Sequence, residues 1–252
     1  MVNVPDTRLE KLEELVKPER VIPATVEIVD IAGLVKGASK GEGLGNQFLG
    51  NIRETDAILH VLRCFDNDNV VHVDGSVDPI RDKETIDMEL QLKDLETVEK
   101  KLDKVNRAAR TGNKEAQKEA AILQIVKEGL ESGTSVRAIV IEEDDRNDYI
   151  KPLQFITDKP VLYICNVDEA SAVSGNSYVE QVKAAVANEK AEVIVLAVGT
   201  EADITELDTY EERQMFLEDL GLTEAGSAKM IRAAYSLLHL QTYFTAGEKE
   251  VR

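Results

Sequence analysis

The sequence predicts an α/β fold: a mostly parallel sheet with flanking helices and an inserted antiparallel helical hairpin. Apolar segments of strand length alternate with segments of helical periodicity, which is typical of a parallel sheet with right-handed crossovers. One long stretch of helical spacing interrupts this alternation. A glycine-spaced loop follows the first clear strand, at Asp30 and Gly33, and open sheets of this class bind ligands beyond the carboxyl ends of their strands.

The other expected elements follow from apolar spacing and from turn residues. Leu9, Leu12 and Val16 lie at helical spacing within residues 1–23, and Pro18 ends that helix. Short apolar runs bounded by polar, Gly or Pro residues predict strands at residues 25–30, 57–65, 135–141, 160–166 and 192–197. Further helices are expected at residues 149–156, 178–188, 209–220 and 228–238.

Residues 82–134 predict the helical hairpin. Apolar residues from Met88 to Ala109 recur at steps of three and four with one polar gap at Gln91, residues 111–113 break the pattern, and residues 116–130 resume it. Basic residues cluster near the expected tip, where they either contact RNA phosphates or form the solvated face of ordinary helices. These residues are Lys100, Lys101, Lys104, Arg107, Arg110, Lys114 and Lys118.

The composition restricts the classes of function. A net charge of -18 argues against a protein that coats nucleic acid with its whole surface. No run of about 18 apolar residues occurs and no apolar signal segment is present, so we expect no membrane span and a cytoplasmic protein. Cys64 and Cys165 lie in apolar segments, which favours buried free thiols over a disulfide. His60, His72 and His239 show no metal-ligand spacing.

A longer motif is far more specific than Asp30 and Gly33 alone. From residue 30 to residue 46 the chain reads Asp-Ile-Ala-Gly-Leu-Val-Lys-Gly-Ala-Ser-Lys-Gly-Glu-Gly-Leu-Gly-Asn, and residues 51–57 read Asn-Ile-Arg-Glu-Thr-Asp-Ala. This sequence closely resembles the Obg-like ATPase family (the YchF type), within the Obg-related P-loop nucleotidases. The resemblance runs over nearly the whole chain.

The resemblance implies a domain organisation. It places the first part of a nucleotide-binding domain at residues 1–81, a coiled-coil insertion at 82–134, the second part of the nucleotide-binding domain at 135–221, and a connecting helix with the start of a β-rich TGS domain at 222–252.

The phosphate-binding loop of such enzymes, Gly-x-x-x-x-Gly-Lys-Ser/Thr, does not occur in the 252 residues. In the family this loop precedes the segment where the chain begins. Met1 therefore looks like an internal start, and the TGS domain looks truncated. Without the loop's strand, normally central, the sheet is expected to expose an apolar edge, and the chain as given is expected to be inactive.

Within the family pattern, Asp30 is the expected magnesium ligand, acting through water, and Gly33 is the expected contact to the γ-phosphate. Leu34 stands where Ras-like enzymes carry a glutamine that orients the attacking water. The resemblance implies that a histidine after the next strand takes part in catalysis, and His72 occupies that place. The alternative interpretation is a half-buried loop histidine.

Asn166-Val167-Asp168-Glu169 stands where guanine-specific enzymes carry Asn-Lys-x-Asp. Glu169 and Val167 depart from that pattern and match a family that prefers ATP or accepts both nucleotides. Asp168 offers a carboxylate one position away, and Asn166 has the alternative role of ending its strand. Ala197 begins a segment that resembles the small loop that contacts the base.

The sequence therefore predicts a Mg²⁺-dependent protein that binds and slowly hydrolyses ATP in its intact form, with GTP as a further substrate. By resemblance its partner is the large ribosomal subunit, with an rRNA contact through the helical arm. Two alternatives stay open: a non-catalytic module that binds the ribosome or RNA, and a GTP-specific regulatory GTPase.

Overall fold

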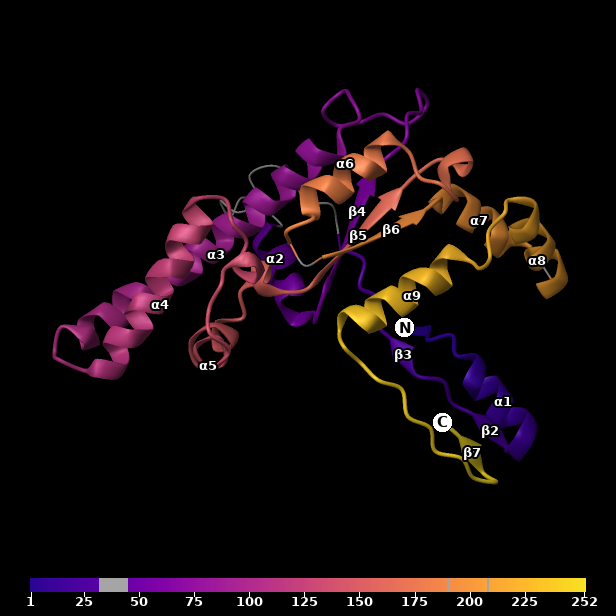
Figure 1. The fold of residues 1–252 in the computed structure, drawn as a ribbon, viewed down its shortest axis with the longest axis horizontal. Helices are drawn as coiled ribbons and strands as arrows, with labels where there is room; N and C mark the ends of the chain where they lie inside the picture. The colour runs from indigo at the N-terminus through magenta and orange to yellow at the C-terminus, as the bar shows by residue number, and fades with distance from the viewer. Residues whose placement is uncertain (32–44, 190, 208) are drawn as a thin grey trace.

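A computed structural model describes residues 1–31, 45–189, 191–207 and 209–252, without the side chains of residues 45–48 and 210. Its centre is a parallel three-stranded sheet in the order β4 (Ile58–Arg63), β5 (Val161–Asn166) and β6 (Glu192–Leu196), shown in Figure 1. The α/β class, the parallel pairing and these three strands are confirmed.

Helices cover the two faces of this sheet, because successive side chains of a strand point to opposite sides. Tyr163 and Cys165 of β5 pack on one face with α6 (Ser177–Val186). Leu162 and Ile164 pack on the other face with α9 (Gly226–Leu237). Cys64 and Cys165 are buried and free, as predicted.

Strand β4 forms an edge of this sheet. It pairs with β5, and within the described residues no strand lies on its other side. Leu62 is 2% exposed, but Val61 is 57% exposed. The prediction of a fully buried strand at 57–65 is therefore wrong, whereas the expected exposed apolar edge is present.

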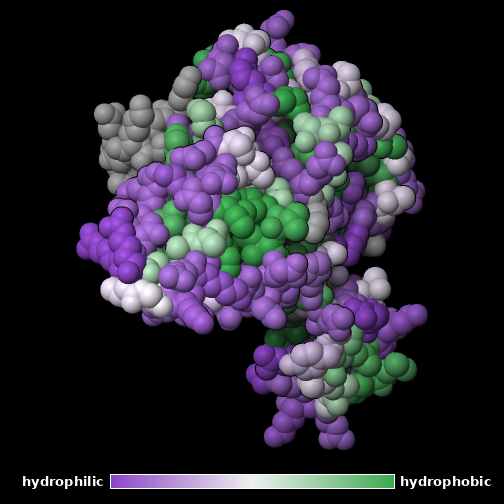
Figure 2. Space-filling view, turned by 60° about the vertical axis from the view of Figure 1, so that its left-hand side comes forward, coloured by the Kyte–Doolittle hydropathy of each residue, from purple (hydrophilic) through white to green (hydrophobic). Residues whose placement is uncertain are grey.

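The two ends of the chain form a smaller lobe below the sheet (Figures 1 and 2). Strand β1 (Val2–Asn3) pairs antiparallel with β3 (Thr25–Val26). Helix α1 (Thr7–Val16) lies between these two strands in the sequence. Strand β2 (Arg20–Val21) pairs in parallel with β7 (Glu250–Val251). The predicted strand at 25–30 is shorter than expected, because its partner provides two residues only.

The predicted hairpin is confirmed. Helix α3 (Pro79–Ala109) and helix α4 (Lys114–Glu131) run side by side and form the arm seen in Figure 1. Gly112 turns the chain with φ +87°, and the Asn113 side chain accepts the Ala116 N–H at 3.1 Å, which begins α4. The facing apolar side chains, Val98, Leu102, Val105, Leu123 and Val126, are buried between the two helices.

A buried ion cluster joins the arm to the sheet. The Lys83 ammonium, on α3, lies 2.7 Å from Asp87 and 2.6 Å from Glu189, which follows α6. The Arg137 guanidinium lies 3.4 Å from Glu189, and the Tyr163 hydroxyl of β5 donates to Glu189 at 2.8 Å. Burial lowers the pKa of Lys83, but the two carboxylates outweigh burial and the pKa is raised.

A second tie holds the root of the arm to the segment before β5. Asp94 of α3 is fully buried, and its carboxylate accepts the N–H groups of Ile156 and Thr157 at 2.9 and 2.7 Å and the Thr157 hydroxyl at 2.7 Å. Thr157 in turn accepts the Val136 N–H at 3.1 Å. These bonds impose short helical turns, so the predicted strand at 135–141 is wrong and the helix at 149–156 is broken. The turns are Val136–Ala138, Arg146–Ile150, Lys151–Leu153 and Ile156–Asp158.

The remaining helices are α2 (Gly45–Glu54), α5 (Glu143–Asp145), α7 (Val198–Glu206) and α8 (Tyr210–Asp219). Helix α7 has no counterpart among the predicted elements. None of the helices in the described residues is long and apolar enough to cross a membrane. Figure 2 shows a face dominated by hydrophilic residues, with a central apolar area and further apolar areas in its upper part and on the lower lobe, in keeping with the strongly charged composition.

We expect Asp94→Asn to lower the free energy of unfolding by about 2 kcal/mol, because an amide oxygen cannot satisfy three buried donors. Urea unfolding followed by circular dichroism measures this. Asp103→Asn is the control, since Asp103 is exposed on the same helix. Equal stability of the two variants would show that the Asp94 bonds are not needed.

Burial lowers the pKa of His60 to about 4, beside Asp87, Lys83, Arg137 and Glu189. Between pH 6.5 and 4 the unfolded chain binds a proton that the folded chain does not, so stability falls as the pH falls. From pH 7 to pH 5 this histidine should remove about 2 kcal/mol. In His60→Phe that part of the pH dependence should disappear, whereas His239→Asn should retain it. Urea unfolding of the parent chain and both variants at pH 7 and pH 5 measures this. An equal loss of stability in the parent chain and in His60→Phe would contradict the assignment.

Candidate functional site

The predicted base-contacting segments meet at the carboxyl edge of the three-stranded sheet. Asn166 ends β5, and its Oδ1 accepts the Val198 N–H at 3.1 Å, at the start of α7. The Val167 N–H donates to the Leu196 carbonyl at 2.8 Å. Asn166 therefore links the two loops that follow β5 and β6, which goes beyond ending its own strand.

The residues after Asn166 are placed differently from one another. The Val167 side chain is 3% exposed and packs in the core with side chains of α6, so it belongs to the core beneath the site. The Asp168 carboxylate accepts the Ser171 N–H at 3.0 Å and caps a short turn. Glu169 is exposed, and its carboxylate has no partner in the part of the chain that the structure describes. Glu169 is thus the available carboxylate of this segment.

Ala197 lies at the beginning of α7 and is 6% exposed. Its carbonyl accepts the Glu201 N–H at 3.0 Å, so its backbone is fixed by the helix. Because the Ala197 side chain is a single methyl group, backbone groups line the space next to Asn166. The structure therefore brings Asn166, Glu169 and Ala197 together at one edge.

The loop after β4 begins at the same edge and contains His72. The Arg63 guanidinium organises this loop by donating to the carbonyls of Phe65, Asn67 and Val70 at 3.1, 3.2 and 2.9 Å. From the other side, the Asn176 amide donates to the Cys64 carbonyl at 2.7 Å.

Both ring nitrogens of His72 are engaged. Its Nδ1 accepts the Asp74 N–H at 3.1 Å, so Nδ1 is unprotonated. The proton is therefore on Nε2, which donates to Asp82 at 2.8 Å. The side chain is 16% exposed. In this arrangement neither nitrogen is available as a base, and a catalytic role requires the contact with Asp82 to open.

His72, Asp74 and Asp82 offer ligand atoms that lie within 4.8 Å of one another. The Arg81 guanidinium lies 3.0 Å from Asp82 and 3.9 Å from Asp74. A cation of the chain itself already balances these carboxylates, and we assign no metal to the cluster.

Two predicted residues belong to the glycine-rich segment. Asp30 is exposed and lies outside the three-stranded sheet, after β3. Gly33 and Leu34 lie outside the described residues. Mg²⁺ requires an octahedron of oxygens, and the sequence lacks the Ser or Thr of a phosphate-binding loop. Asp30 stays a predicted ligand, and the predicted residues within the described part of the chain do not form a magnesium site by themselves.

Sequence reasoning missed Asp82, Arg63 and Asn176. Asp82 lies in the first turn of α3, where acidic residues are common, and no spacing rule connects it to His72. Arg63 and Asn176 act on backbone carbonyls of a neighbouring loop, a role that has no sequence pattern. A tertiary structure was needed to find all three.

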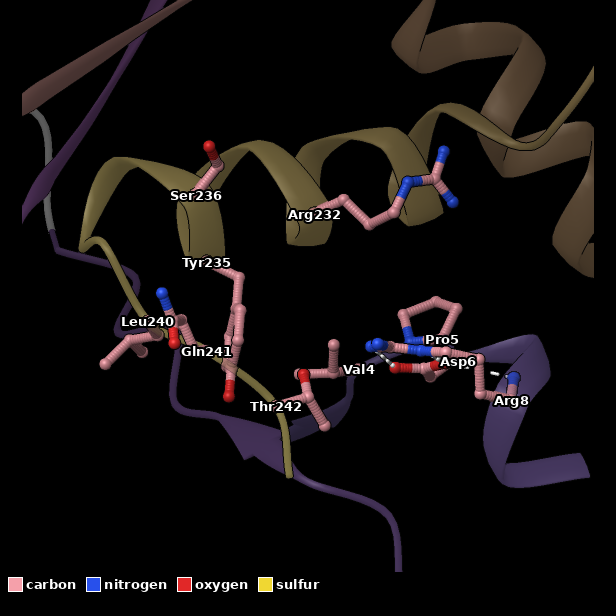
Figure 3. A pocket seen from close by; sticks show the side chains of 10 residues that line it. All are labelled: Val4, Pro5, Asp6, Arg8, Arg232, Tyr235, Ser236, Leu240, Gln241 and Thr242. Carbon is pink, nitrogen blue, oxygen red and sulfur yellow. Dashed lines mark hydrogen bonds and ion pairs between the residues drawn. The ribbon is translucent and has the colours of Figure 1, made fainter. Parts of the chain in front are cut away.

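The structure also has a cleft of about 630 Å³ between the N-terminal segment and α9, away from this edge (Figure 3). Tyr235 points from α9 into the cleft, and Val4 and Thr242 lie below it. Arg8 is paired with Asp6 at 2.7 Å, and Arg232 is paired with Glu224. None of the predicted site residues lines this cleft.

Comparison with known proteins shows the family of the chain. The family model described as 50S ribosome-binding GTPase matches residues 3–167. The chain is 51% identical over 254 residues to the ribosome-binding ATPase YchF of Bacillus subtilis (strain 168), covering 100% of this chain and 69% of the relative. It is 51% identical over 252 residues to the ribosome-binding ATPase YchF of Escherichia coli O157:H7, with the same coverage.

A solved structure, that of the Schizosaccharomyces pombe YchF GTPase, superposes with a TM-score of 0.86 at 37% identity, covering 100% of this chain and 68% of that chain. The fold is thus the α/β fold of the P-loop GTPase class. Within that class the chain belongs to the YchF-type Obg-like ATPase family.

We expect Asp82→Asn to free the His72 ring, because an amide holds the Nε2–H less strongly than a carboxylate does. In the parent chain the ¹⁵N shifts of the ring should show the Nε2–H form alone, and in the variant both tautomers. Asp68→Asn, at an exposed loop position, is the control. Mixed tautomers in the parent chain would contradict the arrangement.

Proposed function

We propose that the protein binds ATP at the carboxyl edge of its sheet and, when joined to a phosphate-binding loop, hydrolyses ATP slowly to ADP and phosphate. The observation that carries this is the bond between Asn166 Oδ1 and the Val198 N–H, which holds the two base-contacting segments together. The identity to ribosome-binding ATPases supports it.

The base preference rests on Glu169 and Val167. In guanine-specific enzymes an aspartate accepts the N1–H and 2-amino protons of guanine, and a lysine packs along the base. Here the carboxylate is one methylene longer, and the residue in the lysine position is buried in the core. Adenine has no N1–H to donate, so the departure favours ATP. Binding of GTP in addition to ATP is part of the proposal.

His72 is the proposed catalytic residue, and Asp30 the proposed Mg²⁺ ligand, through water. Gly33 remains the predicted contact to the γ-phosphate, and the domain boundaries and the TGS assignment also remain predictions. The 252 residues encode no phosphate-binding loop, so for this stretch we propose nucleotide binding without turnover. Slow hydrolysis belongs to a protein in which the stretch is joined to such a loop.

The proposed partner is the ribosome, through its large subunit, in the cytoplasm. The family model and the relatives carry ribosome binding in their names. The arm offers a means of contact, although fewer of its charges are free than the sequence indicated. Lys100, Lys101 and Lys118 pair with Glu96, Glu119 and Asp145. Of the seven basic residues predicted near the tip of the arm, four have no ion pair among the described residues: Lys104, Arg107, Arg110 and Lys114.

These free charges favour a second candidate function, a non-catalytic module that binds the ribosome or its RNA through the arm. It predicts ribosome co-sedimentation that does not depend on nucleotide. Changing Lys104, Arg107, Arg110 and Lys114 to Glu should then abolish co-sedimentation, and unchanged binding would remove the arm from both functions.

Calorimetric titration of the 252-residue chain with ATP and Mg²⁺, and with GTP and Mg²⁺ as the comparison, tests the nucleotide proposal. We expect saturable heat with ATP, weaker than a complete phosphate-binding site would give, and less heat with GTP. Asn166→Ala should remove the ATP signal, because it separates the two loops. A preference for GTP, or no heat with either nucleotide, would contradict the proposal for this chain.

A further inference from the structure

The loop that carries Glu169 begins after Asn166, at the end of β5, and ends at Asn176, where α6 begins. Within this loop a short helical turn spans Glu169–Ser171, and Asp168 caps it by accepting the Ser171 N–H at 3.0 Å. The cap fixes the shape of the turn. The position of the turn relative to the sheet depends on the contacts at the far end of the loop.

The far end of the loop is directed back toward the sheet at Gly175. Its φ is +72°, a left-handed conformation that glycine adopts without strain. The Gly175 N–H donates to the Ser171 carbonyl at 2.8 Å, which joins the turn to the residue before Asn176. The position of Asn176 therefore bears directly on the position of the Glu169 turn.

Asn176 contacts three segments through one amide group. Its Oδ1 accepts the Val179 N–H at 3.2 Å and begins α6. Because that N–H requires an acceptor, the amide oxygen faces α6 and the NH₂ group faces the sheet. Its Nδ2 donates to the Cys64 carbonyl at 2.7 Å and lies 3.5 Å from the Ser171 hydroxyl. Cys64 is 0% exposed, so water does not reach this carbonyl and the amide supplies its donor.

The end of β4 is tied in turn to the segments that contact the base. The Cys64 N–H donates to the Asn166 carbonyl at 2.7 Å, and Asn166 Oδ1 accepts the Val198 N–H at 3.1 Å. A continuous series of hydrogen bonds thus runs from Val198 through Asn166 and Cys64 to Asn176. Both ends of the Glu169 loop are held by the same short stretch of backbone.

We propose that Asn176 is a positioning residue for base recognition, which holds the Glu169 turn against the end of β4 and thereby sets the preference between ATP and GTP. The inference rests on the proposed nucleotide binding at the sheet edge. Glu169 is exposed, so its carboxylate is placed by its backbone turn rather than by side-chain packing. A fixed turn keeps this carboxylate away from the N1–H and 2-amino group of guanine, and a mobile turn lets it reach them.

The first test is Asn176→Asp, studied by calorimetric titration with ATP and with GTP in the presence of Mg²⁺. Aspartate is an equally good helix cap for the Val179 N–H, so the chain should stay folded, but it cannot donate to the Cys64 carbonyl. The ratio of ATP affinity to GTP affinity should fall about fivefold, the size expected for one hydrogen bond.

Two matched controls should keep the parent ratio. Tyr178→Phe removes a hydrogen bond from the same helix to Asp66 in the loop after β4, without touching the Glu169 turn. Ser174→Asp adds the same negative charge at an exposed position and retains the Asn176 amide. An equal fall of the ratio in either control would overturn the proposal.

Glu169→Ala separates positioning from a general loosening of the site. If Asn176 acts through the Glu169 carboxylate, Asn176→Asp should not change the ratio further in a chain that already carries Glu169→Ala. The same fivefold fall without the carboxylate would overturn the proposal. So would an equal loss of affinity for both nucleotides, which is the result expected of a merely structural residue.

A measurement without nucleotide distinguishes this inference from the proposed function. Hydrogen exchange of the Ser171 and Gly175 amides should be about tenfold faster in Asn176→Asp than in the parent chain, because the turn loses its attachment to β4. Unchanged exchange would overturn the positioning role even in a chain that binds ATP. Faster exchange in a chain that binds neither nucleotide would support the placement of the turn by Asn176 and contradict the proposed nucleotide binding.

Discussion

The buried ion cluster of Lys83, Asp87, Glu189 and Arg137 is the interaction on which the rest of the structure depends. It joins three parts that are distant in sequence: the first turns of the arm, the end of α6 and the segment that returns from the arm. Buried charges of this kind are tolerated only when each has a partner, so loss of one partner disrupts all. Together with Asp94 it fixes the first turns of α3 to the sheet and to the segment before β5.

These contacts also connect the His72 loop to the arm. The His72 loop ends where α3 begins, and the Asp78 carboxylate caps that helix. The helix α2 that carries Arg53 packs against the segment held by Asp94, through Leu49, Ile52 and Ile156. Helix α2, helix α3 and β4 thus contribute side chains to one hydrophobic cluster.

The sequence alone was sufficient for the class of fold, for β5, β6 and the hairpin, because their apolar spacing is regular and long. It was insufficient at residues 135–141, where a side chain from another element, Asp94, imposes turns on an apolar run. The motif around Asn166 was recognisable, since its residues are consecutive. The contact of His72 with Asp82 and that of Arg53 with Thr97 were not, because each joins residues from separate elements that meet only through tertiary packing.

If the Lys83 cluster fixes the arm to the sheet, the distance between the two should take a single value. Spin labels at Lys114→Cys and Ala185→Cys, on the arm tip and α6, measure it by electron–electron resonance, and the native Cys64 and Cys165 are buried and do not interfere. The account predicts one narrow distance distribution in the parent chain and a broad one after Lys83→Met. A broad distribution in the parent chain, or a narrow one unchanged by Lys83→Met, would contradict it.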